Sequence, residues 1–73
     1  MNEEEITKKK VEYFYKKNIE VHIKKKNGFL HNGMILEFAG DMIILDDIKS
    51  GAMPIYFIEI LEIEERRKEG VVN

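Results

Sequence analysis

The chain has 73 residues, of which 36% are charged and 44% hydrophobic, and its formal net charge at pH 7 is −2. This length allows one small domain with a modest core, and the absence of cysteine excludes a disulfide framework and a thiolate metal site. Since a small domain without these supports often gains burial from a partner subunit, the composition favours a homo-oligomer.

Neither a membrane span nor an export signal is predicted. No apolar run approaches the ~20 residues that a spanning helix needs. The chain does not open with a charged leader, an apolar core and a small-residue cleavage site, so we expect a cytoplasmic protein.

Charged residues are segregated along the chain. Lysines gather at 8–10, 16–17 and 24–26, whereas acids gather at 3–5, 46–47 and 59–65. A negative net charge gives no overall attraction to nucleic acid, but segregation allows a basic face and an acidic face. Each run taken singly is better explained as a solvated surface.

The first predicted element is a helix from about residue 3 to 17. Asn2 offers an N-cap, three glutamates follow it, and neither proline nor glycine interrupts the chain before Gly28. Val11, Phe14 and Tyr15 fall on one side of a helical wheel. We expect that side to cover the open end of a barrel.

The next stretch, from residue 19 to about 38, predicts a hairpin of two strands. Ile19, Val21 and Ile23 alternate with polar residues, and Asn27-Gly28 is a strong signal for a two-residue turn. Counting outward from that turn places Lys24 opposite His31 and Ile23 opposite Asn32. The predicted register therefore gives one apolar face and one basic and aromatic face.

Gly33 interrupts the second predicted strand. A glycine within a strand usually marks a bulge, a bend or a close approach of another backbone. We expect the bent strand to curl the sheet into a small barrel.

Three more strands are predicted, at 42–45, 53–58 and 60–63. Pro54 confines the beginning of the fourth strand to a sheet edge or a strand start. The predicted fold class is mainly β: an N-terminal α-helix followed by a five-stranded, strongly bent antiparallel small barrel. The whole chain, 1–73, is expected to form a single domain, with the barrel at about 19–64 and a charged, frayed tail at 65–73.

The last two predicted strands are apolar on both faces. A 73-residue monomer is not expected to bury so much apolar surface, and an exposed edge of this kind invites pairing with a neighbouring subunit. The candidate interface residues are Ile55, Tyr56, Phe57, Ile58, Ile60 and Leu61.

This order of elements resembles the Sm-like family of ring-forming RNA-binding proteins, most closely its bacterial Hfq branch. The resemblance covers nearly the whole chain. It rests on Lys17-Asn-Ile-Glu-Val-His-Ile23 leading into Asn27-Gly28, on Gly33-x-Ile35-x-x-Phe38, on the run at 42–45, and on Ile55-Tyr56 before Ile63. It implies a ring assembled by edge pairing of the fourth and fifth strands, with single-stranded RNA as partner.

The sequence departs from the family pattern at the uridine pocket on the inner face of the ring. Ala39 stands where Sm-like proteins usually carry an aspartate, and Ile43 stands where an asparagine would read a base. Asp41 replaces an aromatic of Hfq, and Tyr56-Phe57-Ile58 replaces its Tyr-Lys-His run. The resemblance therefore does not predict this pocket.

The resemblance points instead to a second surface, on the opposite face of the ring, at positions equivalent to Lys24, Phe29 and His31. Phe29 and His31 would stack on bases, while Lys24 and Lys26 would neutralise phosphates. The remaining candidate RNA contacts are Lys16 and Lys17. Alternatively, Phe29 caps the barrel rim or meets another ring, and His31 is an ordinary surface histidine.

No catalytic, metal or cofactor site is predicted. Two histidines without cysteine do not make a metal site, and Asp46 and Asp47 would point apart on a strand. No nucleophile is accompanied by a base. We therefore expect neither an enzyme nor a small-molecule substrate.

Two rival functions remain open. The net negative charge and the altered pocket favour an Sm-like oligomeric scaffold or protein-interaction module without RNA binding. A third possibility is a monomeric SH3-like barrel whose apolar last strands are covered by a different chain.

Overall fold

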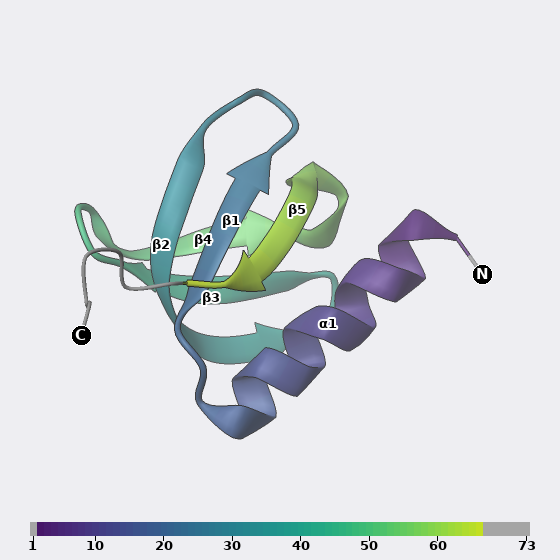
Figure 1. Ribbon diagram of the computed structural model, residues 1–73, viewed down its shortest axis with the longest axis horizontal. Coiled ribbons are helices and arrows are strands. Elements are labelled where there is room, and N and C mark those ends of the chain that lie inside the picture. The colour runs from purple at the N-terminus through teal and green to yellow at the C-terminus, as the bar shows by residue number, and fades with distance from the viewer. Residues whose placement is uncertain (1, 67–73) are drawn as a thin grey trace, which may run out of the picture.

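A computed structural model describes residues 2–66 and contains one helix and five strands (Figure 1). The elements in chain order are α1 (Glu3–Lys17), β1 (Val21–Lys25), β2 (Leu30–Ala39), β3 (Met42–Asp47), β4 (Gly51–Tyr56), the 3-10 turn η1 (Phe57–Glu59) and β5 (Ile60–Glu65). Of the charged tail expected at 65–73, Glu65 belongs to β5, and 67–73 lie outside the described residues. No helix in the described part is long and apolar enough to cross a membrane.

The five strands form one antiparallel sheet in the order β4-β3-β2-β1-β5. Figure 1 shows that the sheet bends strongly, so that β1 and β5 run upright while β3 and β4 run across behind them. The predicted fold class is confirmed, although the sheet does not close, because β4 and β5 remain its two edges.

Helix α1 follows its prediction at both ends. The side-chain oxygen of Asn2 accepts a hydrogen bond of 2.8 Å from the backbone N–H of Glu5, which caps the N-terminus. At the other end Asn18 adopts a left-handed conformation with φ of 56°, and its N–H bonds the last turn of the helix. Val11 and Phe14 are buried, so the predicted apolar side packs on the core.

The predicted register of the first hairpin is wrong by one residue. Lys24 lies opposite Leu30, and Ile23 lies opposite His31. The loop has three residues rather than two, because the N–H of Lys25 bonds the carbonyl of Phe29 at 2.8 Å and the N–H of Gly28 bonds the carbonyl of Lys25. Gly28 takes a φ of 94°, as expected of a three-residue hairpin that ends in a bulge. The slip moves His31 to the other face of the sheet.

Gly33 is a site of close backbone approach, one of the three outcomes predicted for it. A Cβ atom added there would lie 2.0 Å from the backbone oxygen of Asp46, which no side chain tolerates. The bulge itself lies farther along β2, between Ile35 and Glu37, and leaves Leu36 exposed. A glycine and a bulge within one strand together account for the strong bend.

The segment predicted as a single fourth strand changes direction in the structure. Strand β4 ends at Tyr56, and η1 then turns Phe57 into the core beside Phe38, with ring centroids 5.4 Å apart. Ile55, Phe57 and Ile60 are therefore buried within one subunit, so the subunit's own core covers part of the apolar surface of these last strands. The exposed residues of the predicted interface set are Tyr56, Ile58 and Leu61.

Candidate nucleic-acid interface

The β1–β2 hairpin exposes two lysines and two large apolar side chains at and near its turn. These residues, Lys24, Lys26, Phe29 and Leu30, are called the hairpin surface below. Phe29 is 64% exposed and Leu30 is 56% exposed. The Asn27 side chain accepts a hydrogen bond of 3.0 Å from the N–H of Phe29 and so orders the turn. Figure 1 shows the hairpin turn projecting from the end of the sheet away from α1.

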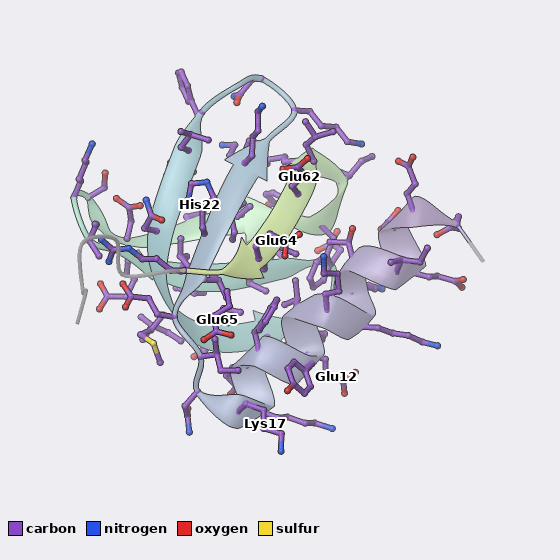
Figure 2. The ribbon with its side chains drawn as sticks, viewed as in Figure 1. Glu12, Lys17, His22, Glu62, Glu64 and Glu65 are labelled. Atoms are coloured by element: carbon purple, nitrogen blue, oxygen red, sulfur yellow. The ribbon has the colours of Figure 1, made fainter. Side chains whose placement is uncertain are left out.

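Acidic residues of β5 and η1 flank the lysines of β1. Lys25 is 14% exposed and forms an ion pair of 3.0 Å with Glu59. Across the sheet, Lys24 lies opposite Glu62 and His22 lies opposite Glu64. Figure 2 shows both glutamates along β5, next to the strand that carries His22. The basic run at 24–26 is therefore partly neutralised, and its least compensated charge is that of Lys26.

The structure separates His31 from the hairpin surface. Its side chain is 13% exposed, and its Nδ1 lies 3.4 Å from Oδ1 of Asp47. The other ring nitrogen, Nε2, is buried and has no hydrogen-bond partner among residues 2–66. The three residues that the sequence places together thus divide into an exposed pair, Lys24 and Phe29, and a largely buried histidine.

Asp47 organises the turn between β3 and β4. Its carboxylate accepts hydrogen bonds from the backbone N–H groups of Lys49, Ser50 and Asn32, at 3.0, 2.9 and 3.2 Å. Burial alone would raise the pKa of Asp47, but these hydrogen bonds outweigh it and lower the pKa below its ordinary value of 3.8. The sequence predicts the turn but not the burial of Asp47. The signal that could have identified this residue is an aspartate at the start of a turn, whose carboxylate can accept a hydrogen bond from the backbone N–H two residues later.

The remaining candidate lysines lie elsewhere. Lys16 pairs with Glu12 of the same helix at 3.3 Å, and both side chains are exposed. Figure 2 shows Lys17 at the C-terminal end of α1, at the opposite end of the molecule from the hairpin turn. The helix lysines therefore form a second basic region rather than an extension of the hairpin surface. Within residues 2–66 no group of three or more histidine, aspartate or glutamate side chains could hold a metal ion.

Comparison with known proteins decides the fold family. No protein-family model and no curated protein matches the sequence. Among solved structures, the 1.55 Å crystal structure of "the pleiotropic translational regulator, Hfq" matches with a TM-score of 0.67 and 28% identity, over 80% of this chain and 95% of that one. The chain has the Sm-like fold of Hfq. The resemblance predicted from the sequence is confirmed, and the chain is a divergent example of this fold.

Within residues 2–66 of the Sm-like chain, both edge strands of the sheet have a free edge, and a groove lies beside one of them. Strand β4 pairs only with β3, and β5 pairs only with β1, within the part of the chain that the structure describes. A groove of about 760 Å³ lies between the first half of α1 and β5. Exposed Ile58 and Leu61 border it, so part of the predicted interface set lies along the edge of β5.

Proposed function

We propose that the chain is a subunit of an Sm-like ring that binds single-stranded RNA through the hairpin surface. The observation that carries the proposal is the exposure of Lys24, Lys26, Phe29 and Leu30 on one hairpin of a fold shared with a protein described as a translational regulator. We propose no catalytic activity, because nothing in that description or in the residues of the hairpin surface indicates one.

The side chains of the hairpin surface are of the kinds that bind single-stranded RNA. An exposed phenylalanine offers a face on which any base can stack, and nearby lysines offset phosphate charge without reading sequence. Phe29 and Lys26 are the proposed principal contacts, with Lys24 beside Glu62 contributing less. Lys16 and Lys17 are proposed as a second contact region, and His31 as a support beneath the surface.

The two free edges support assembly into a ring. Strand β4 and strand β5 expose unpaired backbone groups, which is a template for pairing with another chain. Because the edges differ, pairing β4 of one subunit with β5 of the next is head-to-tail, and such contacts close into a ring when the rotation permits. Exposed Tyr56, Ile58 and Leu61 are the residues whose burial such a contact would add.

The RNA proposal is tested by fluorescence anisotropy with labelled oligo(A) and oligo(U) at low salt. The double variant Lys24→Ala with Phe29→Ala should lose about tenfold or more in affinity, since stacking alone contributes about 1–3 kcal/mol per base. The matched control is Ile48→Ala with Lys49→Ala, which removes an exposed apolar and an exposed basic residue from the β3–β4 turn and should bind like wild type. Absence of wild-type binding at low salt would end the proposal.

A second candidate function is an oligomeric scaffold that binds proteins and not RNA. It is favoured by the acidic residues that flank the β1 lysines, Glu59, Glu62 and Glu64, and by the net charge of −2. The two functions differ in whether nucleic acid copurifies with the native protein: an RNA-binding ring should retain it, and a protein scaffold should not. Size-exclusion chromatography with light scattering gives the subunit number, and ultraviolet absorbance of the same peak shows whether nucleic acid copurifies.

A further inference from the structure

Two asparagines of the chain, Asn27 and Asn32, are each followed by glycine. Asparagine before glycine is especially prone to spontaneous deamidation, because glycine has no side chain to shield its backbone nitrogen. Asn27-Gly28 lies in the exposed turn of the β1–β2 hairpin, whereas Asn32-Gly33 lies within strand β2. The chain therefore presents the same reactive dipeptide in two different backbone settings.

Deamidation of such a dipeptide needs neither an enzyme nor a cofactor. The glycine nitrogen loses its proton to solvent, attacks the side-chain carbon Cγ of the asparagine and forms a C–N bond. The bond from Cγ to Nδ2 then breaks, and Nδ2 takes up a proton and leaves as ammonia. Water opens the resulting cyclic succinimide at either of its carbonyl groups, which gives aspartate or isoaspartate with no change of oxidation state.

Strand β2 holds Asn32 and Gly33 in a backbone that opposes this reaction. The N–H of Asn32 donates to the carboxylate of Asp47 at 3.2 Å, and its carbonyl accepts from the N–H of Ile48 at 2.8 Å. Its side-chain oxygen lies 2.8 Å from Nδ1 of His22. Gly33 is buried and pairs with both β1 and β3. The backbone rotation that brings the glycine nitrogen to Cγ would break this pairing.

The hairpin turn leaves Asn27 and Gly28 accessible. Both residues are exposed, and neither belongs to a strand. The N–H of Phe29 donates at 3.0 Å to the side-chain oxygen of Asn27, on which negative charge develops when the nitrogen attacks, and so stabilises that step. The N–H of Gly28 donates to the carbonyl of Lys25 at 2.9 Å and has to leave it first. Exposed turn bonds of this kind open at a low cost in free energy.

We infer that Asn27 is a site of spontaneous deamidation, and that the fold directs the reaction to Asn27 while it protects Asn32. The native protein thus converts Asn27 to a mixture of aspartate and isoaspartate. The site lies between Lys26 and Phe29, which are the principal RNA contacts proposed above. The modification itself is independent of RNA binding, and only its effect on RNA rests on the proposed function.

Either product places a new carboxylate beside Lys26. This charge offsets the lysine and repels phosphate. Isoaspartate also routes the main chain through the former side chain, which lengthens the loop and displaces the oxygen to which the N–H of Phe29 donates. Since the protein itself does not reverse the change, its affinity for single-stranded RNA should fall with its age.

Mass spectrometry of the folded protein tests the site. Wild-type protein is incubated at neutral pH and sampled over several weeks, and chymotrypsin cleavage after Leu30 places Asn27 and Asn32 on separate peptides. The Asn27 peptide should gain the mass that separates a hydroxyl from an amino group, and isoaspartate methyltransferase should label it. The Asn32 peptide should convert about tenfold more slowly or less, because its reaction requires opening of the sheet.

Protein unfolded in guanidinium chloride is the matched control. Both dipeptides lack structure there, so Asn27 and Asn32 should convert at similar rates. The variant Asn27→Gln should show no conversion at residue 27 on this time scale, because the longer side chain forms its cyclic product far more slowly.

Fluorescence anisotropy with labelled oligo(A) tests the effect on RNA. Asn27→Asp should bind about threefold more weakly than wild type at low salt, and the difference should shrink at high salt because salt screens exposed charges. Asn27→Gln adds no charge and should show no such salt-dependent loss.

The outcomes separate this inference from the proposed function. An Asn27 that stays intact in the folded protein overturns the inference, and so does equal conversion of Asn27 and Asn32 in the folded protein. If Asn27 converts but wild-type protein does not bind RNA, the modification site stands and the proposed function fails. If wild-type protein binds RNA and Asn27→Asp binds equally well at low salt, the effect assigned to the new carboxylate is wrong.

Discussion

Ile23 of β1 lies opposite His31 of β2, with the isoleucine fully buried and the histidine turned toward Asp47. Paired residues on adjacent strands share a face, so His31 belongs to the core side of the sheet. Lys24 and Leu30, one step toward the turn, share the outer face. With His31 on the core side, Phe29 is the aromatic residue that stays exposed beside the hairpin turn.

The salt dependence of RNA binding should distinguish two adjacent lysines. Lys26→Ala should reduce the slope of log affinity against log salt by about 0.7, the value for one phosphate contact with a single strand. Lys25→Ala should leave the slope unchanged, because Lys25 is paired with Glu59 and largely buried. Anisotropy titrations at several salt concentrations measure both slopes. Equal losses from the two variants would contradict the assignment of Lys26.

Asp47 should make the fold sensitive to acid. Its folded pKa is below the ordinary value of 3.8, so the charged carboxylate contributes stability at higher pH that is lost as the pH falls through that range. In Asp47→Asn this part of the acid dependence should disappear, and the variant should be less stable at about pH 7 because charged hydrogen bonds are replaced by neutral ones. Urea unfolding between about pH 7 and about pH 3 measures both effects.

The control for Asp47 is its neighbour Asp46, which is exposed. Asp46→Asn should keep the wild-type acid dependence. If Asp47→Asn and wild type lose stability in parallel as the pH falls, the role given to the Asp47 hydrogen bonds is wrong.

Gly33→Ala should destabilise the fold strongly. The added methyl group would lie 2.0 Å from the backbone oxygen of Asp46, so β2 and β3 must separate locally, at a cost of about 3 kcal/mol or more. Gly28→Asn is the comparison: a Cβ at Gly28 meets nothing within 4 Å, and asparagine tolerates positive φ better than most residues. Urea unfolding should therefore show a much smaller loss for Gly28→Asn, and similar losses would argue against the close approach at Gly33.

Local sequence signals were sufficient to predict the helix and the order of the strands along the chain. Asn2, the glutamates after it and the uninterrupted run to Lys17 depend only on neighbours in sequence, and α1 matches the prediction at both ends. The match of the whole fold to the Hfq crystal structure confirms the predicted order of the helix and strands.

The details of the candidate site depend on geometry that the sequence does not specify. Asn27-Gly28 is compatible with two-residue and three-residue loops, and the choice decides which face His31 occupies. The charge of Lys25 is partly neutralised by Glu59, which is distant in the sequence but adjacent in the fold. Phe57 enters the core because η1 interrupts the strand period after Tyr56.

The pairing of β5 with β1 also bears on how the protein is made. Strand β1 lacks its second neighbour until β5 has been synthesised, because β5 is the last of the five strands in chain order. Until then Ile23 lacks its partner Ile63, and the helix lacks the ion pair of Lys10 with Glu64. Contacts between such distant parts of a chain slow folding, so the nascent protein passes through a stage in which its apolar interior is open to other chains.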